Sequence, residues 1–108
     1  MNYNNQQNNQ FQQNQYKPNL QIKTRGNGID QNEYNTITNS CINAYSNKAY
    51  PLSTNASNNI KNTIGGEWFV CSNPNDKKDF DFSLTSARTE DSLIFTVDTI
   101  LFQVCRLK

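Results

Sequence analysis

The chain has 108 residues and a formal charge of +1 at pH 7, with ten Lys and Arg residues, nine Asp and Glu residues and no histidine. A chain of this length forms one domain with a small core, because it buries only about 60–65% of the surface that it exposes when unfolded. The near-neutral balance argues against a nucleic-acid partner, which needs a concentrated basic face, and the lack of histidine excludes Ser-His and Cys-His catalysis and histidine metal ligation.

No apolar run approaches the roughly 18 residues needed to cross a bilayer, so we expect a soluble protein with no membrane partner. The three cysteines, Cys41, Cys71 and Cys105, lack the paired spacing of a zinc site, and we predict neither a metal nor a cofactor. Because no apolar signal segment precedes them, we expect a reducing interior and free buried thiols. A thiol-dependent redox protein using Cys71 or Cys105 stays open as an alternative, although a cysteine within a strand is by default inert.

Residues 1–17 form a tail made mostly of asparagine and glutamine. This tail offers almost nothing to bury, so we expect it to stay disordered by itself and to be dispensable for folding. The same composition is typical of prion-like assembly elements, and an assembly protein driven by the tail is therefore a further alternative.

The first structured segment is a short predicted strand over 18–24, followed by a glycine-containing loop. Asp30 and Glu33 then stand at the N-cap and N3 positions of a helix, the pattern of a capping box. Apolar residues recur behind them at helical spacing, namely Tyr34, Ile37, Cys41, Ile42 and Tyr45. The sequence thus predicts an amphipathic helix over 31–47.

A second helix is predicted after Pro51, which ends the first. Ser53 is placed to cap it, and its apolar residues, Ala56, Ile60 and Ile64, follow at i, i+4 and i+8. The pair Gly65-Gly66 supplies the left-handed backbone that favours a helix exit.

Four closely spaced strands are predicted in the remaining sequence, at 67–72, 80–85, 92–97 and 100–106. Each carries β-branched and aromatic residues at period two, and turn-forming residues separate them. Together with the strand at 18–24 they predict an α+β fold, in which two helices pack on an antiparallel five-stranded sheet. Because two helices cover one face only, we expect Trp68 and other large apolar groups to form an interface on the opposite face.

The strand at 80–85 is isolated by charged loops on both sides. Phe80, Phe82 and Leu84 face one way along it, and Asp81, Ser83 and Thr85 face the other. Such a strand can pair with a strand outside its own chain.

This order of elements resembles the dynein light chain type 1 family, the eight-kilodalton hub light chains. The resemblance is carried by Ile60-Lys61, Gly65-Gly66-Glu67-Trp68, the frame at Phe80 and Thr85, Phe95 and the closing hairpin to Arg106. It covers residues 18–108 and implies one dynein light chain domain there.

The resemblance implies a strand-exchanged dimer, in which the strand matching 80–85 joins the sheet of its partner and client segments add beside it. It implies a non-catalytic light chain that binds extended segments of dynein intermediate chains and supports assembly of a dynein motor complex. Its partner in the dimer is a second copy or a sister light chain. The expected location is the cytoplasm and cytoskeleton, and within it the axoneme of a cilium.

The predicted sites follow from the apolar faces and from this resemblance. The dimer interface is predicted at Trp68, Phe69, Phe80, Phe82 and Leu84. The client groove is predicted at Ser53, Thr54, Asn55, Asp81, Ser83, Thr85, Ser86, Ile94 and Thr96. Ser83, Ile94 and Thr96 stand where the family commonly has groove tyrosines, which implies a dedicated axonemal light chain with one or two fixed partners.

Overall fold

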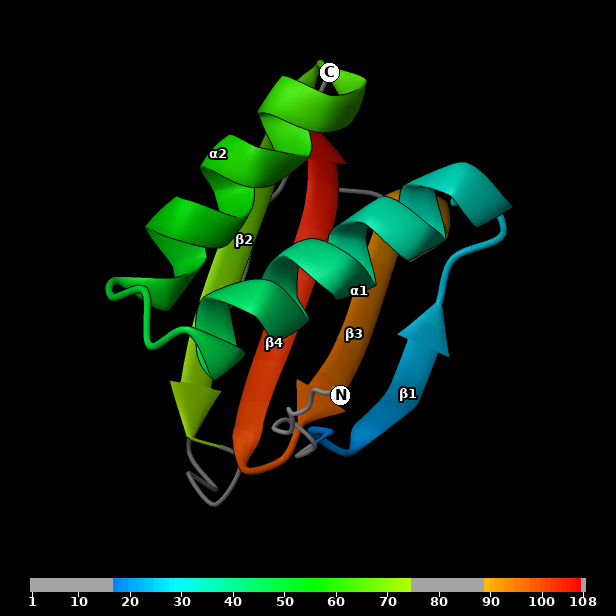
Figure 1. The fold of residues 1–108 in the computed structure, drawn as a ribbon. Coiled ribbons are helices and arrows are strands. Elements are labelled where there is room, and N and C mark those ends of the chain that lie inside the picture. Colours follow the sequence, from blue (N-terminus) through cyan, green and yellow to red (C-terminus); the bar gives the residue numbers. More distant parts are fainter. Residues whose placement is uncertain (1–16, 75–88, 108) are drawn as a thin grey trace, which may run out of the picture.

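The computed structural model describes residues 17–74 and 89–107 (Figure 1). Its elements in chain order are β1 (Leu20–Arg25), α1 (Gln31–Ser46), α2 (Leu52–Ile64), β2 (Glu67–Pro74), a short 3-10 helix (Thr89–Asp91), β3 (Ser92–Val97) and β4 (Ile100–Leu107). Both helices lie on the same face of the antiparallel sheet, in front of it in Figure 1. The predicted α+β class is confirmed.

The described residues form a four-stranded sheet with the order β1-β3-β4-β2. One row of paired residues crosses all of it, because Leu20 pairs with Val97, Val97 with Ile100, and Ile100 with Pro74. The fifth predicted strand, 80–85, lies outside the described residues, so the five-stranded sheet and the strand-exchanged dimer stay predictions.

A tight hairpin joins β3 to β4 and also holds the start of β1. Asp98 follows Val97 with a positive φ of 54°, a conformation that suits a two-residue hairpin turn. Its carboxylate accepts a hydrogen bond from the Asn19 N–H at 2.7 Å, and its own N–H donates to the Asn19 carbonyl at 2.8 Å. The chain before β1 is thereby fixed at the hairpin end of the sheet.

Helix α1 begins with the predicted capping box. The Glu33 N–H donates to the Asp30 carboxylate at 2.8 Å, and the Asp30 N–H donates to the Glu33 carboxylate at 3.0 Å. The helix ends at Ser46, one residue before the predicted end. Its buried side chains include Ile37, Cys41 and Ala44, whose spacing turns one stripe of the helix toward the sheet.

Helix α2 begins at Leu52, after Pro51 in the N-cap position, and no side chain caps it. The prediction that Ser53 is the cap is therefore wrong. Leu52 is buried in the core and starts the helix early, so Ser53 already lies inside the first turn. The predicted exit is confirmed, because Gly65 and Gly66 have φ values of 75° and 82°.

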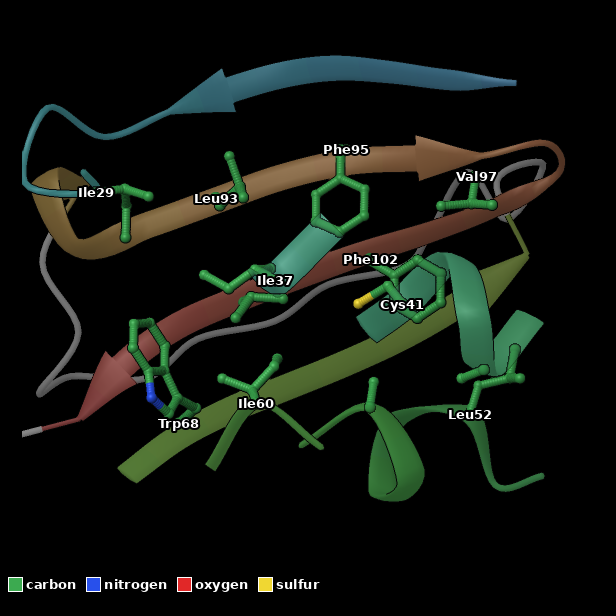
Figure 2. Close-up of a cluster of buried hydrophobic side chains, with 13 residues drawn as sticks. Ile29, Ile37, Cys41, Leu52, Ile60, Trp68, Leu93, Phe95, Val97 and Phe102 are labelled. Carbon is green, nitrogen blue, oxygen red and sulfur yellow. The ribbon is translucent and has the colours of Figure 1, made fainter. Parts of the chain in front are cut away.

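The core lies between the helices and the sheet (Figure 2). Its fully buried members from the sheet are Leu93, Phe95, Val97, Phe102 and Val104, and Ile37, Cys41, Ala56 and Ile60 come from the helices. Phe95 and Phe102 stack with their ring centroids 5.6 Å apart, which links β3 to β4 under α1.

Trp68 belongs to this core and is only 8% exposed. Its indole N–H donates to the Gly65 carbonyl at 2.8 Å, so the polar end of the ring is satisfied inside the fold. Figure 2 shows the ring among the side chains on the helix side of the sheet. The expectation that Trp68 lies on the opposite face is wrong, because the alternation along β2 turns Trp68 and Val70 toward α2 and Phe69 away from it.

Across the residues that the structure describes, no helix combines the length and the apolar character required to span a membrane.

Candidate functional site

The candidate site is built on β2, which lies at one edge of the sheet. This strand runs in regular register with β4 from Glu67, opposite Leu107, to Pro74, opposite Ile100. Within the described residues, β4 is its only strand partner. An edge strand presents backbone N–H and C=O groups along its outer side, so β2 is a place where a further strand can add.

A groove of about 280 Å³ runs between α2 and this edge strand. Its lining consists of Ser53, Thr54, Ser57 and Asn58 from the helix and Trp68, Phe69 and Val70 from the strand. The helix residues lie at i and i+4 spacing, which places them on one face beside the apolar stripe that packs on the sheet. Hydroxyl and amide groups thus face apolar strand residues, and among the described residues the lining carries no charged side chain.

The first turn of α2 opens into this groove. Pro51 has no side-chain acceptor to offer the first backbone N–H groups of the helix, and Ser53 and Thr54 belong to that turn. Asn55 points elsewhere, because its amide donates to the Ala49 and Pro51 carbonyls at 3.0 Å each. Of the three residues predicted at this helix end, the structure therefore brings Ser53 and Thr54 into the groove and leaves Asn55 out.

Asn55 lines a second groove, of about 250 Å³, between the two helices. The other lining residues are Ser40, Asn43, Ala44, Asn47, Ala49 and Asn59. The Asn59 amide donates to the Ser40 hydroxyl at 2.8 Å across it, which joins α1 to α2.

Two further predicted groove residues, Ile94 and Thr96, lie on β3 and on the face of the sheet turned away from the helices. Ile94 pairs with Gln103, and Thr96, which is buried, pairs with Leu101. Strand β4 separates them from β2. A single chain therefore does not gather these residues with Ser53 and Thr54.

Phe69 is the one predicted interface residue that the structure places on the face away from the helices. It pairs with Cys105 across β2 and β4 and is half-buried. On the same face, the buried Gln103 side-chain oxygen has no hydrogen-bond partner within the described residues. The remaining predicted residues, Phe80, Asp81, Phe82, Ser83, Leu84, Thr85 and Ser86, lie outside the described residues.

The three cysteines are free thiols. Burial raises the pKa of Cys41 far above its usual range. Burial also raises the pKa of Cys71, and a hydrogen bond from the Asn73 amide opposes this shift. Cys105 is buried beside the Ser92 hydroxyl, with 3.3 Å between Sγ and Oγ. The raised pKa values keep Cys41 and Cys71 protonated at neutral pH, which makes both thiols weak nucleophiles.

Neither the residues 17–74 nor 89–107 contain a group of three or more His, Cys, Asp or Glu side chains arranged to hold a metal ion.

Arg106, whose role was not predicted from the sequence, connects β4 to α1 and to the segment before β3. Its guanidinium contacts the buried Asp91 carboxylate at 2.5 Å and the Glu33 carboxylate at 2.6 Å, and it donates to the Gly28 carbonyl at 3.2 Å. The same group lies 5.2 Å from the Trp68 ring centroid. The sequence did contain a signal for these contacts. Arg106 stands at a core-facing position of β4, and a charged residue can be buried there only with partners.

Ser57 and Asn58 are groove residues that the sequence reasoning also missed. Both follow by four positions the residues that were predicted, Ser53 and Thr54. Helical periodicity could have identified them, since residues at i and i+4 share a helix face.

Comparison with protein families finds no family model that matches this chain. No curated protein matches it in sequence either. Among solved structures, it is similar to the dynein light chain-like domain of the Fasciola hepatica calcium-binding protein FhCaBP2. The TM-score is 0.58 at 9% sequence identity, and the match covers 82% of this chain and 92% of that one. The chain therefore has a dynein light chain-like fold.

Proposed function

We propose that this chain is a non-catalytic binding module of the dynein light chain type, which dimerises and holds extended segments of dynein intermediate chains. The observation that carries the proposal is the uncharged groove between α2 and the edge strand β2, lined by Ser53, Thr54 and five further residues. A light-chain role fits the dynein light chain-like fold.

Strand addition accounts for how such a module binds. The strand at 80–85 of a partner chain pairs with the β2 edge, and the client pairs in turn with that strand. The client side chains then lie over the first turn of α2, whose N–H groups donate to a polar client side chain such as glutamine. In this arrangement Ile94 and Thr96 reach the client from the partner's copy, which removes the separation seen within one chain.

The role of the dimer is to hold two copies of a client side by side. Each bound pair raises the effective concentration of the two client chains for each other, and this supports assembly of a dynein motor complex. Such a complex places the protein in the cytoplasm and cytoskeleton, and in a ciliated cell at the axoneme.

The absence of histidine from the sequence and the raised pKa values of Cys41 and Cys71 favour binding over catalysis. Burial raises the pKa of both thiols, whereas nucleophilic catalysis requires a thiol that is activated.

The test is a calorimetric titration of the full chain with peptides that tile the dynein intermediate chains. Thr54→Lys places a charge in the groove and should weaken binding by at least about tenfold, because the lining offers no partner for it. Thr24→Lys, on the exposed strand β1, is the matched control and should bind normally. Ser83→Lys and Thr85→Lys extend the test to the predicted client strand. Unchanged binding by Thr54→Lys, with a normal melting curve, would place the client site elsewhere.

A further inference from the structure

The groove between α2 and β2 selects by chemistry as well as by shape. It presents the hydroxyl groups of Ser53, Thr54 and Ser57 and the amide of Asn58, and the part of its lining that the structure describes has no charged group. A charged side chain would lose its hydration here without gaining an ion pair, which is unfavourable. A side-chain amide both donates and accepts hydrogen bonds, so it can satisfy hydroxyl and amide partners without a charge.

One segment of this same chain has that chemistry. Residues 1–16 contain six asparagines and six glutamines and carry no charged side chain. Tyr3, Phe11 and Tyr16 interrupt the amides with aromatic rings, which suit the apolar side of the groove at Trp68 and Val70.

The register of the sheet shows that this segment starts at a suitable end of the molecule. Leu20 lies in the row of paired residues that ends at Pro74 of β2, three strand spacings away. Three spacings amount to about 14 Å. The reciprocal hydrogen bonds between Asn19 and Asp98 fix the point at which the chain leaves this row.

The length of the segment exceeds the path to the groove. From Pro74 the groove residues Val70 and Trp68 lie four and six positions back along β2, about 13–20 Å at the rise of a strand. The whole path is thus about 34 Å, whereas 16 extended residues span about 53 Å. A segment of 16 residues is therefore long enough to reach the groove of its own chain.

We propose that residues 1–16 occupy the groove between α2 and β2 of their own chain and compete there with the client. The competition with a client rests on the proposed function, whereas the docking of the tail does not. Because the tail is tethered, it competes at a high effective concentration even when its contacts are weak. The apparent affinity for the client is then the intrinsic affinity multiplied by the fraction of molecules whose groove is free of the tail.

Nuclear magnetic resonance of the full ¹⁵N-labelled chain tests this without any client. In one variant Gln6, Gln7, Gln10 and Gln12 are all changed to Lys, which gives the tail charges that the groove cannot pair. In the matched control the same four positions become Asn, which keeps them uncharged amides. We expect the amide signals of Ser53, Thr54, Ser57 and Asn58 to move in the Lys variant and to stay in the Asn control.

The reciprocal experiment changes the groove. Ser57→Lys should shift the amide signals of residues 1–16, whereas Asn43→Lys, in the groove between the helices, should leave them in place. Both effects should be the same at low and high protein concentration. Groove signals that do not respond to the tail overturn the proposal, and so do signals that respond only at high concentration, which would assign the tail to a second copy.

Competition gives the link to function. If a client peptide binds, the Lys variant of the tail should bind it about twofold more tightly than the natural chain, the gain expected when the tail fills the groove in half of the molecules. Equal affinities in a chain whose groove signals did move would show that the client binds elsewhere. That result contradicts the proposed function and leaves the docking of the tail intact.

Discussion

The two edges of this sheet are built in opposite ways. Edge strand β1 has an irregular register between Ile22 and Thr24, which leaves Lys23 as an extra residue, and five of its six residues are exposed. Edge strand β2 pairs with β4 over eight residues without a register shift, and most of its side chains are half-buried. A bulge and a lysine are common means of preventing a further strand from adding to an edge. The fold thus protects β1 and leaves β2 suited to being covered.

The charges of β1 are also used inside the chain. The Arg25 guanidinium lies 4.4 Å from the Tyr34 ring centroid and donates to the Ile29 carbonyl at 3.2 Å. These contacts tie β1 to the start of α1. Within residues 17–74 and 89–107, no comparable charged side chain lines the groove beside β2, so the difference between the edges extends from backbone register to side-chain chemistry.

The first prediction tests whether only β2 belongs to a dimer interface. The natural chain should sediment at twice the monomer mass at micromolar concentration. Phe69→Glu on β2 should weaken the dimer by at least about 100-fold, because burying an unpaired carboxylate costs several kcal/mol. Ile22→Glu on β1 introduces the same group at the other edge, where the side chain is 39% exposed, and should leave the dimer unchanged. Analytical ultracentrifugation measures both.

Two outcomes would contradict this prediction. A well-folded natural monomer at micromolar concentration would exclude the homodimer, and a full dimer of Phe69→Glu would place the interface elsewhere. Trp68 fluorescence reports whether Phe69→Glu still folds, since the only tryptophan of the chain lies in the core.

Much of this architecture could be predicted from the sequence, because local signals agreed with the fold. The capping box at Asp30 and Glu33 located the start of α1, and Gly65-Gly66 located the end of α2. Period-two alternation located β2, β3 and β4, whereas the strand predicted at 80–85 lies outside the described residues. The direction of Trp68 could not be predicted in this way, since alternation separates two faces of a strand without telling which one the helices cover.

The candidate site was predicted only in part, because the sequence shows where a helix starts but not where every side chain points. Ser53 and Thr54 were found through the position of a helix start, and the structure places both in the groove. Asn55 lies outside this groove, because its amide donates to two local carbonyls, which the sequence does not reveal. The contacts of Arg106 join residues 15 and 73 positions away, a separation at which local patterns carry no information.

The second prediction concerns Arg106 of β4, which contacts Asp91 before β3 and Glu33 on α1. Arg106→Met keeps most of the side-chain volume and removes the charge that Asp91 and Glu33 contact. Removing the guanidinium takes away the positive charge that contacts the buried Asp91 carboxylate, which should cost about 2–4 kcal/mol, the outer Glu33 contact being partly exposed to solvent. We expect a melting temperature lower by about 10 °C or more by circular dichroism.

Lys61→Met is the control for the second prediction. Its ion pair with Glu67 is exposed on both sides, so breaking it should change stability by less than about 1 kcal/mol. Equal effects of Arg106→Met and Lys61→Met would show that the contacts of Arg106 with Asp91 and Glu33 do not stabilise the fold.

The third prediction compares a core thiol with a thiol on the β2 edge under alkaline conditions. Burial raises the pKa of Cys41, so the folded state keeps its proton after the unfolded chain has lost it. The contribution of this thiol to the free energy of unfolding is fully present below the unfolded-state pKa of about 8.5 and is lost as the pH rises above that value. The free energy of unfolding should fall by up to about 1.4 kcal/mol per pH unit for one such thiol.

Urea unfolding between pH 8 and about pH 10 measures this slope. Cys41→Ala should flatten it more than Cys71→Ala, because Cys71 on β2 is only half-buried. The absolute stability of either variant does not enter, since the comparison uses the slopes alone. A slope that responds only to Cys71 would mean that the edge strand is the better shielded of the two sites.

The smallest effect is expected from removing residues 1–16, which precede β1 in the sequence and are proposed to reach β2. A tethered segment that fills its groove in half of the molecules stabilises the fold by RT ln 2, about 0.4 kcal/mol. That corresponds to a fall of about 2–3 °C in melting temperature when the segment is deleted. Thermal unfolding followed by circular dichroism measures it, and sedimentation of the same sample should show an unchanged dimer.

A fall of about 10 °C would show instead that the segment packs as part of the fold, because only extensive burial repays the entropy of ordering a chain so rich in amides. In that event the β2 edge is covered permanently by the chain's own N-terminus, and the contrast between the two edges would describe a closed molecule rather than a binding module.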